Sequence, residues 1–140
     1  MKLEEQVCSL ELAKRLKELG VKQESLFYWC PSKTHDDAWV IKYGLMPDKM
    51  AHTHEFSAFT VAELGEMLPQ NIQAKKEDAG SVETGHWYLQ QDKFHDHWRI
   101  YYAFGGTFVY ETEGPTEADA RAKMLINLIE NKQHVPNQLH

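Results

Sequence analysis

The chain of 140 residues contains only two cysteines, no long hydrophobic run and no cluster of basic residues. Cys8 and Cys30 cannot build the disulfide framework of a small secreted domain, and they lack the spacing of a metal-binding knuckle. The first residues, MKLEEQVCS, have no apolar segment of signal-peptide length, and no later stretch is long enough to span a bilayer. We therefore expect a cytoplasmic protein that does not associate with membranes.

Basic residues are too scattered to predict a nucleic-acid-binding surface. Lys75 and Lys76 are followed at once by Glu77 and Asp78, and the formal net charge is −6. Because binding to a phosphate backbone depends on clustered Lys and Arg, we do not expect nucleic acid as the main partner. Phosphate-binding, dinucleotide-binding, zinc-protease and nucleophile-elbow motifs are also missing. The sequence favours a protein without catalytic activity, although catalytic residues can assemble from distant positions.

Apolar residues at helical spacing predict a helix near the N-terminus. Leu12, Leu16 and Leu19 recur on one helical face. Ser9 is placed to cap the first turn, and Gly20 is placed to end the helix in the left-handed conformation. This helix should therefore pack its leucine face against the rest of the protein.

Two further helices begin at capping signals. Thr60 and Glu63 have the spacing of a capping box, and Pro69 limits that helix to a few turns. Thr116, followed by Asp119, starts a long C-terminal helix with a buried apolar stripe. The sequence thus predicts a short helix in the middle of the chain and a long one near its end.

Alternating and aromatic runs between the helices predict strands. They cover residues 26–30, 38–43, 86–92, 97–104 and 107–112. Gly105-Gly106 supplies the two positive-φ positions of a tight turn. Residues 70–85 are polar and are predicted to form a surface loop.

These elements together predict an α+β fold. Because the strands follow one another through short connections, their pairing should be antiparallel. We expect an antiparallel sheet of about five strands, with the N-terminal, middle and C-terminal helices packed on it. Residues 1–140 should form a single domain, and residues 133–140 should form a frayed tail.

Four blocks of sequence resemble a known group of proteins. They are CSLELAKRLKELGVKQESLFYW, KYGLMPD, FTVAELGEMLP and TEADARAKMLINLIENK. These blocks are similar to small uncharacterised phage- and prophage-type bacterial proteins of unassigned function. The resemblance implies a cytoplasmic accessory protein in a bacterial or phage-infected host cell, and it implies no catalytic or binding residue.

Two histidine pairs are the candidate metal ligands. His52 and His54, like His95 and His97, are separated by one residue, which places both side chains on the same face of an extended strand. If the two pairs converge, they can bind a divalent metal such as Zn²⁺, Fe²⁺ or Mn²⁺ and support a metal-dependent enzyme. Chance pairing in polar loops also explains them, because the chain has eight histidines. No other cofactor is predicted.

Arg99, Trp87 and Tyr101 are the candidate ligand-binding residues. Arg99 and Tyr101 alternate on the non-core face of one predicted strand, and Trp87 or Tyr88 comes from the neighbouring strand. A guanidinium among aromatic rings can stack on a base or bind a phosphate or a peptide, as in a small-ligand or nucleic-acid binder. Ordinary cross-strand packing explains the same pattern.

The abundance of Trp and Tyr on both faces of the predicted strands favours protein binding. A sheet that has helices on one side cannot bury its other face, so aromatic side chains should remain available there. We therefore expect a non-catalytic accessory protein that acts on a protein partner or on a second copy of itself as a homo-oligomer. A host or defence protein is a natural target for a phage-type accessory protein.

Overall fold

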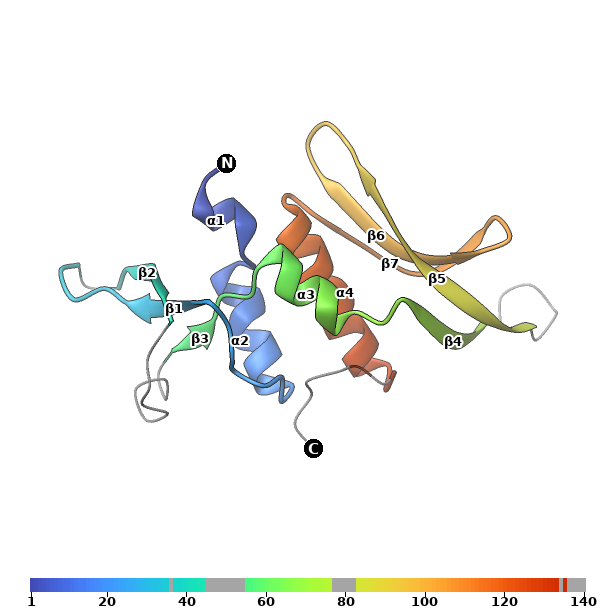
Figure 1. Ribbon diagram of the computed structural model, residues 1–140, viewed down its shortest axis with the longest axis horizontal. Helices are drawn as coiled ribbons and strands as arrows, with labels where there is room; N and C mark the ends of the chain where they lie inside the picture. The colour runs from blue at the N-terminus through green and yellow to red at the C-terminus, as the bar shows by residue number, and fades with distance from the viewer. Residues whose placement is uncertain (36, 45–54, 77–82, 134, 136–140) are drawn as a thin grey trace.

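The computed structural model describes residues 1–35, 37–44, 55–76, 83–133 and 135. The helices lie in the middle of the molecule, with one sheet on each side (Figure 1). The elements in chain order are α1 (Leu3–Gln6), α2 (Leu10–Glu18), β1 (Phe27–Pro31), β2 (Trp39–Tyr43), β3 (Phe56–Ser57), α3 (Val61–Met67), β4 (Asn71–Lys76), β5 (Glu83–Lys93), β6 (Trp98–Phe104), β7 (Thr107–Gly114) and α4 (Glu117–Glu130). The predicted α+β class is confirmed.

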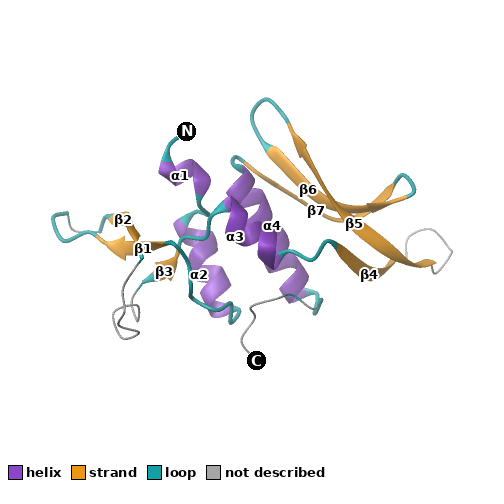
Figure 2. Ribbon diagram, in the orientation of Figure 1, coloured by secondary structure: helices purple, strands orange, loops and turns teal. Residues whose placement is uncertain are grey.

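The strands form two antiparallel sheets (Figure 2). The first sheet has the order β2-β1-β3, and the second has the order β4-β5-β6-β7. The sequence predicts antiparallel pairing correctly, but it predicts one sheet of about five strands. The chain divides at α3 because β3 pairs back onto β1, whereas β4 pairs forward with β5.

The prediction of a surface loop over residues 70–85 is wrong for its described part. Asn71–Lys76 form strand β4, which pairs with β5 along six residues. Only Ile72 on this strand is buried among the side chains described, and it lies opposite Trp87. Asn71 and Gln73 point away from the core and are exposed, which gives the segment the polar composition of a loop.

The predicted capping residues lie at the helix starts. The Thr60 hydroxyl accepts the Glu63 N–H at 3.1 Å, and the Glu63 carboxylate accepts the Thr60 N–H at 3.0 Å. Thr116 accepts the Asp119 N–H at 3.1 Å. Ser9 precedes α2 as predicted, although its side chain makes no capping bond. These caps satisfy backbone donors that a helix leaves unpaired at its N-terminus.

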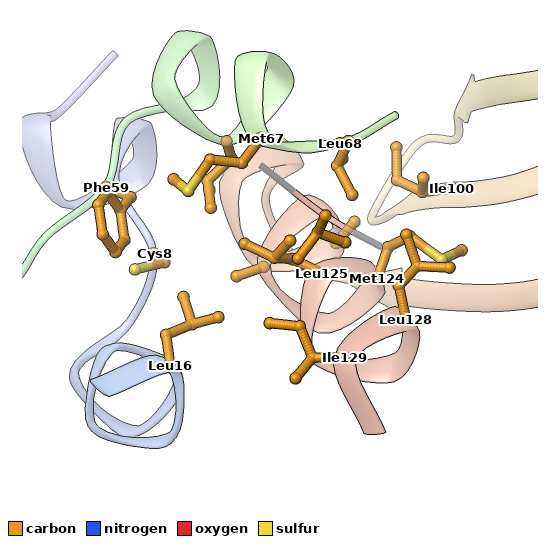
Figure 3. Close-up of a cluster of buried hydrophobic side chains, with 14 of the residues drawn as sticks. Cys8, Leu16, Phe59, Met67, Leu68, Ile100, Met124, Leu125, Leu128 and Ile129 are labelled. Carbon is orange, nitrogen blue, oxygen red and sulfur yellow. The ribbon is translucent and has the colours of Figure 1, made fainter. Parts of the chain in front are cut away.

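The main core lies between the helices and the inner face of the second sheet (Figure 3). Leu16 from α2, Met67 from α3 and Ile100 from β6 converge on Met124 and Leu125 of α4. Each such side chain contributes roughly 1.5–3 kcal/mol when it is fully removed from water. The C-terminal helix therefore packs on the sheet as predicted.

The segment after α4 folds back on the protein for at least part of its length. The Gln133 N–H donates to the Leu128 carbonyl at 2.9 Å, and its side chain donates to the Gln73 carbonyl at 3.2 Å. Val135 is buried. Residues 134 and 136–140 of the predicted tail lie outside the described residues. Across the described ranges, no helix has the length and apolar character needed to cross a membrane.

Candidate functional site on the second sheet

The two faces of the second sheet differ in their surroundings. Trp87 on β5, together with Ile100 and Tyr102 on β6, points towards α4 and is buried. The residues between them in sequence point the other way, and no described element lies over that side in Figure 1. We call this side the open face. It comprises Tyr88, Gln90, Asp92, Phe94, His97, Arg99, Tyr101, Ala103, Phe108, Glu111 and Glu113.

Arg99 lies at the centre of the open face between two carboxylates. Asp92 is its direct partner across the β5–β6 pair, and the two side chains form an ion pair of 2.6 Å. The Glu111 carboxylate of β7 lies 3.6 Å from the other terminal nitrogen of Arg99. The Arg99 hydrogen bond lowers the pKa of Asp92 and raises that of Arg99 itself. Both charges are therefore maintained over the physiological pH range.

Aromatic rings surround the Arg99 guanidinium. Its central carbon lies 4.8 Å from the centre of the Tyr101 ring, 5.5 Å from Phe94 and 5.9 Å from Phe108. These are cation–π distances. The Tyr101 and Phe108 rings also meet edge to face at 5.6 Å. The rings are thereby fixed in position around one cation.

Three of the five exposed aromatic side chains among the described residues lie on this face. Tyr88 is 50% exposed, Phe94 41% and Phe108 45%. They come from β5, the β5–β6 connection and β7, so three separate segments contribute to one apolar surface. Because large apolar side chains that gather at a surface mark interaction sites, this grouping is the main functional feature of the face.

Asp96 and Glu113 form a second pair of carboxylates, at the end of the open face next to the β5–β6 connection. The His97 ring stacks on Phe94 at 4.6 Å and 13°. Its Nδ1 lies 2.7 Å from Asp96, and its Nε2 lies 3.9 Å from Glu113. The hydrogen bond with His97 lowers the pKa of Asp96. The aromatic surface is therefore bordered by carboxylates at this end as well.

The structure brings together only part of the predicted ligand-binding set, and its ligand-binding role stays a prediction. Arg99 and Tyr101 share one face, as predicted. The prediction that Trp87 lies beside them is wrong, because Trp87 is only 2% exposed and belongs to the inner face. Tyr88 takes the outward position instead. Arg99 is also paired with two carboxylates, so it is not a free cation for a phosphate group.

Phe108 is a site residue that the sequence reasoning missed. A two-residue turn at Gly105-Gly106 pairs residue 104 with 107 and residue 103 with 108. That register places Phe108 on the face of Ala103, Tyr101 and Arg99. The predicted two-residue turn was therefore sufficient to predict the position of Phe108. Phe94 follows a strand and gave no comparable signal.

Only one of the two predicted histidine pairs lies within the described residues. His95 is exposed, and His97 is bonded to Asp96 and stacked on Phe94. Among the residues that the structure describes, no group of three or more His, Cys, Asp and Glu side chains could bind a metal ion. His52 and His54 lie outside the described residues. The convergence of the two pairs therefore stays a prediction.

The two thiols lie away from the open face. Both Cys8 and Cys30 are buried. Burial raises the pKa of Cys8 to about 12 and that of Cys30 to about 11, and the neighbouring Glu55 adds to the second shift. Because the thiolate is the reactive species, neither cysteine is poised for nucleophilic chemistry.

A cavity beside α1 is a weaker candidate for a functional site than the open face. It has a volume of about 400 Å³. Its lining is Met1, Gln6, Thr60, Val61, Ala62 and Glu117. The Thr60 hydroxyl is already bonded to the Glu63 N–H, and Glu117 to Arg121 at 2.9 Å. Small-ligand sites need polar groups that converge on the ligand, and these two are committed to the fold.

Comparison with protein-family models, with curated proteins and with solved structures finds no match to this chain. The resemblance to phage-type proteins therefore stays a prediction. The fold and the open face define a mixed helix–sheet protein with an aromatic, acid-bordered surface on one side. Its function is inferred from that surface.

Proposed function

We propose that this protein is a non-catalytic accessory protein that binds another protein through the open face of its second sheet. The observation that supports this proposal is the grouping of Tyr88, Phe94 and Phe108, each about half exposed, on a face that no described element covers. Aromatic side chains are enriched at the centres of protein interfaces, where they account for much of the binding free energy.

The fold does not need these aromatic side chains for its core. The inner face of the same strands already supplies Trp87, Ile100 and Tyr102, which are buried against the helices. On the open face, comparable rings remain in water. A half-exposed ring contributes less to folding than a buried one and lowers solubility, so a binding role accounts for these rings better than a structural one alone.

The rings are also held in place before any partner arrives. Arg99 contacts Tyr101, Phe94 and Phe108, and its ion pair with Asp92 fixes the guanidinium on the sheet. A surface whose side chains are already ordered loses less conformational entropy on binding. The resemblance to phage-type proteins suggests a host protein as the target in a bacterial cell.

The test compares the wild-type protein with two variants. Tyr88→Ser combined with Phe108→Ser removes two rings from the open face, whereas Tyr43→Ser removes a ring that is 59% exposed on the first sheet. Immobilised protein is incubated with bacterial lysate, and retained proteins are identified by mass spectrometry. Light scattering of each purified protein reports self-association.

We expect the wild type and Y43S to retain the same partner and the double variant to lose it by at least about tenfold, which corresponds to about 1.4 kcal/mol. Circular dichroism should show that all three proteins are folded. Equal retention by the three proteins would contradict the proposal. So would a wild-type protein that stays monomeric and retains nothing.

A further inference from the structure

The charge on the open face is strongly unbalanced. Four carboxylates, those of Asp92, Asp96, Glu111 and Glu113, lie on it or at its border, and among the side chains described there Arg99 is the one permanent cation. From this imbalance we infer that the segment docking on the open face presents Lys or Arg side chains. This inference rests on the proposed function and names the chemistry of the partner.

Glu111 and Glu113 have the most unused capacity for a cation. Glu111 is 3.6 Å from Arg99, which is already bound more closely by Asp92, and Glu113 is 3.9 Å from the His97 ring. An ionised carboxylate can accept several hydrogen bonds at once. Both residues therefore leave oxygen atoms free for donors from a partner.

Arg99 shows which ligand chemistry the open face favours. Its guanidinium lies against aromatic rings and is bonded to a carboxylate at 2.6 Å. The exposed ring of Phe94 stacks on His97, which pairs with Asp96. That of Phe108 contacts Arg99, which Glu111 also approaches. A guanidinium or ammonium group of a partner would contact an aromatic ring and a carboxylate in the same way. Both interactions become stronger when the partner excludes water.

The size of the face favours a peptide segment over a second copy of the chain. Strands lie about 4.8 Å apart and rise about 3.4 Å per residue, so the three strands β5, β6 and β7, paired over six residues, present a flat area of roughly 300 Å². Stable interfaces between folded proteins bury about 800 Å² on each side. Two copies meeting face to face would also bring their carboxylates together, which is unfavourable.

The test measures binding of two labelled probe peptides to the full chain by fluorescence anisotropy. One peptide alternates Arg and Ala, and the other alternates Glu and Ala. Each is titrated against the wild type, Glu111→Gln with Glu113→Gln, and Glu4→Gln with Glu24→Gln. The second pair of glutamates is exposed on α1 and before β1, so both double variants change the net charge equally.

We expect the wild type to bind the Arg peptide and not the Glu peptide. The affinity should fall about tenfold in E111Q/E113Q and less than twofold in E4Q/E24Q. Phe108→Ala should also weaken binding, since the ring contributes the cation–π contact. Circular dichroism of each variant excludes unfolding as the cause.

Two results would overturn the inference. If both double variants lose affinity equally, the peptide senses only the net charge of the protein. If the Arg and Glu peptides bind alike, or if the Arg peptide does not bind, the partner is not recognised by its cations. The lysate experiment separates the two ideas. If Y88S/F108S loses the lysate partner although the peptides give one of these results, the proposed function stands and only the inferred chemistry of the partner is wrong.

Discussion

Asp119 joins the N-terminal ends of the two longest helices. Its carboxylate accepts the Ser9 N–H at 2.8 Å, and its own N–H donates to the Thr116 hydroxyl. This bond satisfies the backbone N–H of Ser9, the residue that immediately precedes α2. Removing the acceptor with Asp119→Ala should cost about 1 kcal/mol of unfolding free energy.

The protonation of Asp119 makes a testable contribution to the pH dependence of stability. Burial raises the pKa of Asp119 above its ordinary 3.8, despite opposing effects from Ser9 and Lys123. The folded protein therefore binds this proton more tightly than the unfolded chain does. The contribution of the group to stability is fully present below the ordinary pKa and is lost as the pH rises through the raised value.

Asp119→Asn isolates this effect, because asparagine retains an oxygen for Ser9 but cannot ionise. Relative to D119N, the wild type should lose unfolding free energy between about pH 4 and about pH 7. Urea unfolding of both proteins at these two pH values measures the change. The comparison cancels the opposite contributions of Asp92 and Asp96, whose pKa values are lowered. A gap that stays constant with pH would contradict the expectation.

Gly114 allows β7 to approach the start of α4. A Cβ at this position would lie 2.7 Å from the Ala120 nitrogen and 3.0 Å from the backbone of Asp119. Gly114→Ala should therefore destabilise the protein by about 2 kcal/mol, as measured by thermal or urea unfolding.

Gly65→Ala is the matched control for that substitution. A Cβ at Gly65 would meet only the end of the Arg121 side chain, which can move. Alanine also favours helix by about 1 kcal/mol over glycine. We expect G65A to be much less destabilised than G114A, and the reverse order would show that the approach of β7 to α4 is not limiting.

At the scale of elements, the cap of α3 also anchors the first sheet. One Glu63 oxygen accepts the Thr60 N–H at 3.0 Å, and the other accepts the Leu26 N–H at 3.2 Å just before β1. Glu63→Ala should lose both bonds, and Glu63→Gln should keep only one because its amide has a single oxygen. We expect losses of about 2 and about 1 kcal/mol in urea unfolding. Equal losses would show that the bond to Leu26 contributes nothing.

Local signals predicted the helices better than the sheets. The caps at Thr60 and Thr116 depend on residues three apart, so the sequence contains all that is needed to find them. The separation into two sheets depends on β3 pairing with β1 and β4 with β5, which no local pattern specifies. Strand β4 was missed because Ile72 is its one buried residue among the described side chains.

The residues of the open face could be predicted only where a local pattern specifies them. Alternation along β6 places Arg99 and Tyr101 together, whereas the choice between Trp87 and Tyr88 depends on which side of β5 meets α4. On β7, a bulge at Tyr110, where φ is +54°, shifts the alternation before Glu111. A strict period of two therefore fails to place the second acidic partner of Arg99.

At the scale of the whole molecule, Cys8 can report global unfolding. Its thiol is fully buried, and burial raises its pKa to about 12. Labelling of the Cys30→Ser variant with a thiol reagent at about pH 8 should be slower by at least about a hundredfold in the native protein than in urea, because the thiolate forms only on exposure. Rapid native labelling would show that the core opens locally around Cys8.

The contact between Ser9 and Asp119 spans 110 positions of the chain. On a ribosome that adds about 5–20 residues each second, α2 waits roughly 5–20 s for the helix that covers its leucines. During that interval the nascent polypeptide exposes the apolar leucine face of α2, and we expect chaperones to bind it. Translation halted before α4 should yield a product that cellular proteases remove rapidly.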